Sequence, residues 1–127
     1  MAIKKLLERN ALVIAILLTL VIAFLSLVSL KGIHVIKVKN SDKYSHFIAY
    51  FVLCLSWLFA HMHSSKLQLK KLKKYTIVLF LIVYGIIIEV LQGVLTTYRQ
   101  ADFFDFLANS AGVLMAAFIF EKVRRFL

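Results

Sequence analysis

The stretch GIIIEVLQG, from Gly85 to Gly93, places one carboxylate, Glu89, inside the apolar run that decides the fold. No other charged residue occurs between Lys74 and Arg99. A run of this length and apolarity is typical of a helix that crosses a bilayer, where a charged side chain at the centre costs about 2.5 kcal/mol or more. A chain keeps such a group when it faces the protein interior or a wet cavity and has a partner. We therefore expect a membrane helix with its polar side turned inward.

Three further apolar runs extend this prediction to the whole chain. The chain has 127 residues, of which 62% are hydrophobic, compared with about 45–50% in a typical soluble domain. Crossing a bilayer takes about 20 apolar residues. We predict an all-α fold, a four-transmembrane-helix bundle that forms one membrane domain over residues 1–127. The expected helices cover about residues 10–30, 43–63, 75–97 and 102–121.

The first apolar run could be mistaken for a cleaved signal peptide. It is longer than the apolar region of such a signal, which is about 7–15 residues, and no clear cleavage site follows it. We therefore expect it to be a retained helix. Cys54 is the single cysteine, so a disulfide within the chain is excluded.

The net charge of +10 is distributed in a way that indicates membrane topology. Eleven of the 16 Lys and Arg residues lie before the first apolar run, between the second and third, or at the C-terminus. The positive-inside rule then predicts that both termini are cytoplasmic. Anionic lipid headgroups account for the basic loop, and no nucleic-acid partner is expected.

Polar residues of the last three expected helices recur at spacings of three and four, so those of each helix share one face. In the predicted topology these faces are polar toward the outer end of each helix. They should line one pocket that opens outward and narrows toward Glu89. The polar residues are Asp42, His46, Glu89, Gln92, Arg99, Asp102, Asp105 and Asn109.

Two stretches match the signatures of a known family in order and spacing. SDKYSHFIAYFVL, at 41–53, has the pattern Asp-Lys-x-x-His-Phe-x-x-Tyr. EVLQGVLTTYRQADFFDFLANSAG, at 89–112, has Glu-x-x-Gln, then Arg, then Asp-x-x-Asp-x-x-x-Asn-x-x-Gly. The chain thus resembles the VanZ-like family of small bacterial membrane proteins, although a Thr-Thr-Tyr run precedes Arg99 where members often have proline or glycine. The match rests on Asp42, Lys43, His46, Tyr50, Glu89, Gln92, Arg99, Asp102, Asp105, Asn109 and Gly112.

The resemblance implies a location in the cytoplasmic (inner) membrane of a bacterium. It also implies a role at the cell envelope, because the founding member is linked to low-level resistance to the glycopeptide teicoplanin. Our leading hypothesis is a pocket that binds the headgroup of an anionic amphiphile, namely a phospholipid, a polyprenyl phosphate or a glycopeptide-type antibiotic. Glu89, His46 and Asp105 are the candidates for acid–base chemistry. Arg99 and Lys43 would hold the anion. The residues expected to contact the ligand are Asp42, Lys43, Tyr50, Gln92, Arg99, Asp102 and Asn109.

Other functions remain open. The chain could be an intramembrane enzyme that acts on a lipid-linked envelope substrate, or a proton-coupled carrier in which Glu89 binds the proton. It could also be a structural membrane protein. In that case Ala108, Gly112 and Ala116, a ridge of small residues, would form the seam of a homo-oligomer.

The polar residues also have structural interpretations. Glu89 could be a buried hydrogen-bond hub, Asp102 could cap the fourth helix, and Arg99 could pair with Asp102 or Asp105. No cofactor is expected, and no metal is assigned. As a weaker alternative, the oxygen ligands of Glu89, Asp102, Asp105 and Asn109 would suit a divalent cation.

The first expected helix is assigned to packing. This helix offers only Thr19, Ser26 and Ser29 on one side, so we expect it to take no part in the chemistry. Trp57 and Tyr98 are expected to be packing or interface aromatics, and this is the structural interpretation of Tyr50 as well.

Overall fold

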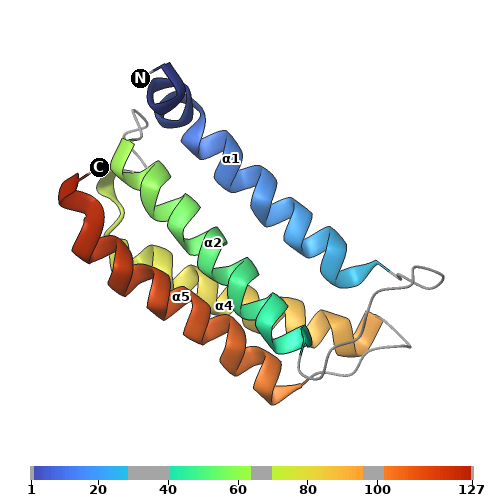
Figure 1. The fold of residues 1–127 in the computed structure, drawn as a ribbon. Helices are drawn as coiled ribbons and strands as arrows, with labels where there is room; N and C mark the ends of the chain where they lie inside the picture. The colour runs from blue at the N-terminus through green and yellow to red at the C-terminus, as the bar shows by residue number, and fades with distance from the viewer. Residues whose placement is uncertain (1, 29–40, 64–69, 96–101, 127) are drawn as a thin grey trace.

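The structure, a computed structural model, describes residues 2–28, 41–63, 70–95 and 102–126. Its helices run side by side, with successive helices in opposite directions (Figure 1). Four of them are long and apolar enough to cross a membrane, which confirms the predicted all-α class and the four spanning helices. The elements are α1 (Ala2–Leu27), α2 (Ser41–His63), α4 (Lys74–Leu95), α5 (Phe103–Val123) and the short 3-10 turn η1 (Arg124–Phe126).

Helix lengths match a bilayer. The shortest of the four, α5, has 21 residues, and about 1.5 Å per residue gives it a length of about 31 Å. The helix α1 begins at Ala2, earlier than the expected start near residue 10. Its first turns are rich in residues that favour helix, and Lys4 pairs with Glu8 one turn later at 3.9 Å.

Within the described residues, α2 is the central helix of the bundle. It packs most extensively against α5 and also contacts α1 and α4, whereas α1 contacts α2 and α4. The buried core is apolar and is shared by α2, α4 and α5. It contains Tyr50, Leu53, Cys54, Leu58, Ile77, Leu81, Val113, Ala116 and Phe120.

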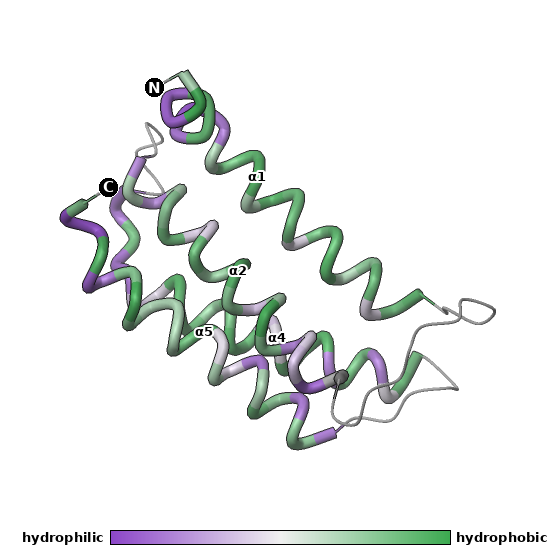
Figure 2. The backbone as a smooth tube through the Cα atoms, viewed as in Figure 1, coloured by the Kyte–Doolittle hydropathy of each residue, from purple (hydrophilic) through white to green (hydrophobic). Residues whose placement is uncertain are grey.

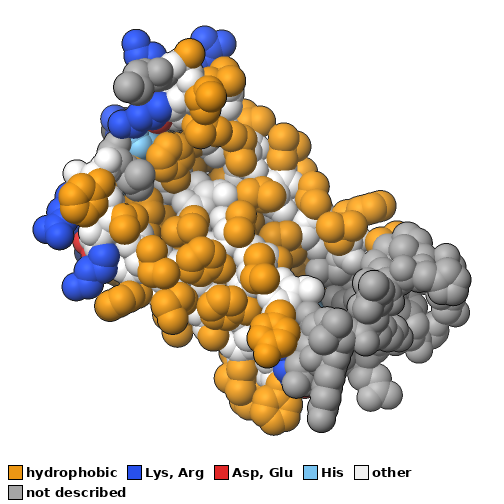
Figure 3. All heavy atoms as spheres, in the orientation of Figure 1, with side chains coloured by type: hydrophobic (Ala, Val, Ile, Leu, Met, Phe, Trp, Pro, Cys, Tyr) orange, Lys and Arg blue, Asp and Glu red, His pale blue; other side chains and the backbone are white. Residues whose placement is uncertain are grey.

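The outer surface of the bundle is largely hydrophobic, as contact with lipid requires. Hydrophobic side chains cover the flank of the bundle, while Lys and Arg gather at the end that holds both termini (Figure 3). Hydrophilic positions concentrate toward the two ends of the helices (Figure 2). The basic side chains at this end are among those on which the topology prediction rests, and the cytoplasmic location of the termini stays a prediction.

The first helix is attached by hydrogen bonds as well as by packing. The indole Nε1 of Trp57 donates to Thr19 Oγ1 at 2.9 Å, and the Tyr84 hydroxyl donates to the Thr19 carbonyl at 2.6 Å. Farther along α1, Gln92 Nε2 donates to the Ser26 carbonyl at 2.9 Å. These hydrogen bonds run from α2 and α4 to α1, so α1 is held in the bundle by polar as well as apolar contacts.

Gly112 lies where α5 packs tightly against the backbone of α2. A Cβ atom at this position would lie 2.4 Å from the Phe47 carbonyl oxygen and 3.1 Å from the Phe51 backbone nitrogen. Both are backbone atoms, so no side-chain rotation would make room. Gly112 and Ala116 are buried within the single chain. The ridge of small residues therefore serves packing within the bundle, and self-association through it stays a prediction.

We expect Gly112→Ala to lower the free energy of unfolding in detergent by about 1–3 kcal/mol, because the added methyl forces α2 and α5 apart. Gly93→Ala is the matched control, since Gly93 is exposed in α4. Denaturant unfolding followed by circular dichroism measures both variants. Equal stabilities of the two variants would show that the α2–α5 approach is looser than described.

Candidate functional site

The polar site lies at the end of the bundle where α2 and α5 begin and α4 ends (Figure 1). Each of these helices contributes two positions one turn apart, because residues four apart share a face. An outer layer and a deeper layer result. The outer layer contains His46, Glu89 and Asp105, and the deeper layer contains Tyr50, Gly85 and Asn109.

Glu89 is buried, with 5% of its surface exposed. Its Oε1 accepts a hydrogen bond from the backbone N–H of Asp102 at 2.7 Å, which ties α4 to the start of α5. Its Oε2 is buried and has no hydrogen-bond partner within the described part of the chain. The buried carboxylate thus has a main-chain partner on one oxygen and an unsatisfied second oxygen.

His46 and Asp105 complete the outer layer. His46 Nε2 lies 3.7 Å from Asp105 Oδ2, and His46, Glu89 and Asp105 each place one possible ligand atom within 4.8 Å of the others. The His46–Asp105 distance exceeds the hydrogen-bond range of about 2.7–3.2 Å. The three groups therefore form one compact cluster of possible ligand atoms.

Lys43 forms the outer rim together with Asp102. Its Nζ lies 3.7 Å from Asp102 Oδ2 and 3.8 Å from Asp105 Oδ1. The side chains of Lys43 and Asp102 are 37% and 41% exposed, whereas that of Asp105 is 14% exposed. Lys43 thus pairs with Asp102 and Asp105, the two aspartates that the sequence analysis considered as partners of Arg99. The side chain of Asp42 and the whole of Arg99 lie outside the described residues.

The deeper layer is polar but closed to solvent. Tyr50 and Asn109 are 1% and 2% exposed. The Tyr50 hydroxyl and both amide atoms of Asn109 have no hydrogen-bond partner among the described residues. Gln92, expected to join them, is also buried, but its Nε2 bonds to the Ser26 carbonyl of α1. The structure therefore brings Tyr50 and Asn109 beneath the cluster and directs the amide nitrogen of Gln92 to α1.

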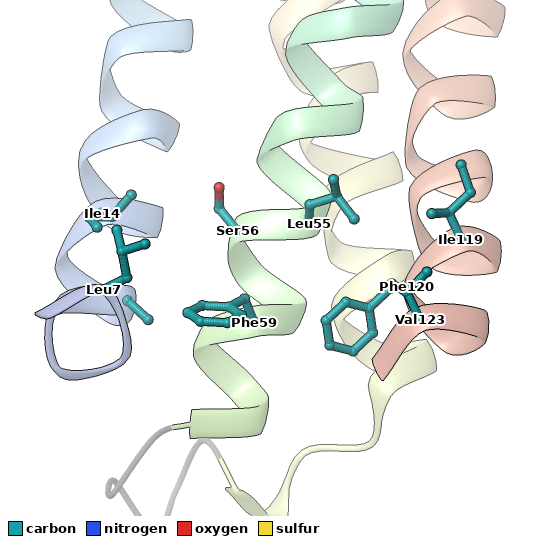
Figure 4. Close-up of a pocket in the computed structure, with 9 residues that line it drawn as sticks. Leu7, Ile14, Leu55, Ser56, Phe59, Ile119, Phe120 and Val123 are labelled. Carbon is teal, nitrogen blue, oxygen red and sulfur yellow. The ribbon is translucent and has the colours of Figure 1, made fainter. Parts of the chain in front are cut away.

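The opposite end of the bundle carries an apolar groove of about 420 Å³ between α1, α2 and α5 (Figure 4). Leu7, Phe59 and Val123 are among its lining residues. The one polar side chain in the lining, Ser56, bonds back to the Val52 carbonyl at 2.8 Å. The groove offers no group for chemistry, so the candidate site is the polar end.

A family model described as VanZ/LLP1 matches the chain over residues 3–124. The chain belongs to the VanZ/LLP1 family. The predicted membership is thereby confirmed, and this VanZ/LLP1 protein is a multi-pass membrane protein. A search of the curated proteins found no match, and a search of the solved structures found none either. The match includes both sequence signatures, and it names no ligand.

Two partners of this VanZ/LLP1 site were missed at the sequence level. The backbone N–H of Asp102 satisfies Glu89, and the Ser26 carbonyl binds Gln92. Both are main-chain groups, which every residue carries, so no residue type could mark them. The pairing of Lys43 with Asp102 and Asp105 had a signal in the sequence, since Lys43 precedes His46 by one turn on the helix face that carries the site.

Asp102 has the structural role that its position suggested. It is the N-cap of α5, and its Oδ1 accepts from the Phe104 N–H at 2.8 Å. We expect Asp102→Ala to lower the free energy of unfolding by about 1 kcal/mol. Asp102→Asn keeps a capping oxygen while it loses the charge near Lys43, so it should stay close to wild type. Equal losses in the two variants would assign the effect to the ion pair instead of the cap.

Proposed function

We propose that this VanZ/LLP1 protein binds the headgroup of an anionic amphiphile at the polar end of the bundle. One observation carries the proposal. Buried polar atoms of Glu89, Tyr50 and Asn109 have no hydrogen-bond partner in the described residues, although such atoms in native proteins almost always have one. A site whose buried polar atoms lack hydrogen-bond partners among the described residues is suited to a ligand that supplies those partners.

The rim indicates the charge of that ligand. Lys43 lies at ion-pair distances of 3.7 and 3.8 Å from Asp102 and Asp105, longer than the 2.7–2.9 Å or so of a direct charged hydrogen bond. Its ammonium group can therefore donate hydrogen bonds to a phosphate or carboxylate oxygen without breaking a short contact. Arg99, a few residues before Asp102 in the chain, is expected to add a second cation with a planar fork.

The interior of the site indicates what else the headgroup carries. Glu89 Oε2 and Asn109 Oδ1 are acceptors, and both are buried. A headgroup with hydroxyl or amine donors beside its anionic group would satisfy them. Phospholipids with such headgroups and glycopeptide-type antibiotics have both kinds of group, whereas a polyprenyl phosphate would satisfy the rim alone.

The surface beside the rim suits an apolar tail. Tyr44 and Ile48 of α2 and Phe103 and Leu107 of α5 are large, exposed and hydrophobic. In a bilayer these side chains face acyl chains, so a bound amphiphile would keep its tail in lipid while its headgroup enters between the helices. No hydrated path through the apolar half of the bundle is needed for this function.

Acid–base groups favour a second candidate, an intramembrane enzyme that acts on a lipid-linked envelope substrate. His46 lies 3.7 Å from Asp105, and Glu89 is close to both. A histidine beside carboxylates can exchange a proton with a bound headgroup. Release of the headgroup from bound lipid by the purified protein would favour the enzyme over the binder.

Native mass spectrometry of the detergent-purified chain would test the proposal with phosphatidylglycerol, undecaprenyl phosphate and phosphatidylcholine as probes. We expect one anionic lipid retained per chain, with retention falling about tenfold or more in Lys43→Gln and in Arg99→Gln. A hydrogen bond to a charged group contributes about 1.5–3 kcal/mol, and 1.4 kcal/mol corresponds to about tenfold.

Lys74→Gln is the matched control, since Lys74 pairs with Glu121 at 3.3 Å at the opposite end of the bundle. It should leave retention unchanged. If Lys74→Gln loses as much lipid as Lys43→Gln, the binding is non-specific attraction to a basic surface. Phosphatidylcholine retained as well as the anionic lipids would likewise contradict an anion receptor.

A further inference from the structure

We infer that His46, Glu89 and Asp105 together hold one divalent transition-metal ion, Zn²⁺ or Mn²⁺, between α2, α4 and α5. The inference goes beyond the proposed headgroup binding and does not depend on it, because the three ligands lie inside the Lys43–Asp102 rim. Each ligand comes from a different helix. A bound ion would therefore cross-link the polar ends of three helices.

The geometry is close to that of a metal site. The three possible ligand atoms lie within 4.8 Å of one another, with His46 Nε2 and Asp105 Oδ2 3.7 Å apart. Ligands about 2.0–2.2 Å from a common ion stand about 3–3.5 Å apart when they are tetrahedral or octahedral neighbours. Side-chain rotations that move the atoms by about 1 Å would close the site.

A separate observation indicates that a ligand belongs here. Glu89 is 5% exposed, and its Oε2 is buried without a hydrogen-bond partner in the part of the chain that the structure describes. A buried carboxylate oxygen that lacks a partner is costly. Two carboxylates and a neutral imidazole carry a charge of −2, which a divalent cation balances. Lys43 lies 3.8 Å from Asp105 Oδ1, at the half-exposed rim of the site.

The ligand types select the ion. An imidazole nitrogen suits Zn²⁺ and its first-row neighbours, and carboxylates also suit Mn²⁺, whereas Mg²⁺ and Ca²⁺ prefer oxygen ligands alone. The oxygen-only set expected from the sequence therefore changes. Asp102 is occupied as the N-cap of α5, and His46 joins Glu89 and Asp105. Three protein ligands leave a coordination position for water or a ligand oxygen.

The test uses the full chain in lipid-free detergent, stripped with a chelator and titrated with Mn²⁺ or Zn²⁺ alone. We expect one Mn²⁺ per chain, counted by electron paramagnetic resonance, with a histidine nitrogen coupling in the pulsed spectrum. Asp105→Asn and Glu89→Gln should weaken binding by about tenfold or more. His46→Gln should remove the nitrogen coupling. Circular dichroism and gel filtration establish that each variant is folded.

His63→Gln is the matched control, because His63 Nδ1 lies 3.7 Å from Glu8 Oε1 in a histidine–carboxylate pair at the other end of the bundle. It should leave the affinity and the nitrogen coupling unchanged. Folded wild-type protein that binds neither ion stoichiometrically would overturn the inference, whatever the variants do. So would a nitrogen coupling that survives His46→Gln or disappears in His63→Gln. Lipid is absent throughout, so these outcomes do not bear on headgroup binding.

Discussion

A carboxylate inside a membrane-spanning helix must be satisfied by the protein, and that constraint governs the polar end of this bundle. Glu89 meets it in part through the backbone N–H of Asp102 at 2.7 Å. The hydrogen bond couples the end of α4 to the start of α5 and places Glu89 beside His46 and Asp105. Its second oxygen has no hydrogen-bond partner among the described residues, and the proposed headgroup binding and metal binding both involve this oxygen.

The apolar packing positions this cluster. The absence of a side chain at Gly112 lets α5 approach the α2 backbone at Phe47, the residue next to His46. Asp105 lies two turns before Gly112 on the same face of α5. The close approach therefore brings Asp105 toward His46, and a wider helix separation would open the 3.7 Å distance between them. The packing of α5 on α2 in the middle of the bundle therefore also determines the geometry of the polar cluster at its end.

Helical periodicity was enough to predict the four spanning helices and the shared inward faces of α2, α4 and α5. Every described member of the predicted set lies at the polar end, and the roles assigned to these residues from the sequence stay predictions. Gln92 has the spacing of a site residue, yet its amide nitrogen donates to a carbonyl of α1. Spacing gives the face on which a residue lies, and only the tertiary structure decides which neighbouring helix that face contacts.

Two further features also depended on tertiary structure. Gly112 belongs to a motif that serves equally well within a chain or between chains, and the structure shows its use against α2. Asp102 caps α5 with its side chain as expected, and it also contacts Glu89 through its backbone N–H, which the sequence did not indicate. Spacing predicts which face a residue lies on, and it carries no information on main-chain partners.

The most direct test of this account is the distance between the Glu89 carboxyl carbon and the Asp102 amide nitrogen, measured by solid-state NMR on selectively labelled protein in bilayers. An N–H···O bond of normal length predicts about 3.5 Å between these two atoms, together with the absence of contacts from Glu89 to lipid acyl chains. Weak dipolar coupling, with the Glu89 carboxyl in contact with lipid or bulk water, would contradict the inward-facing cluster.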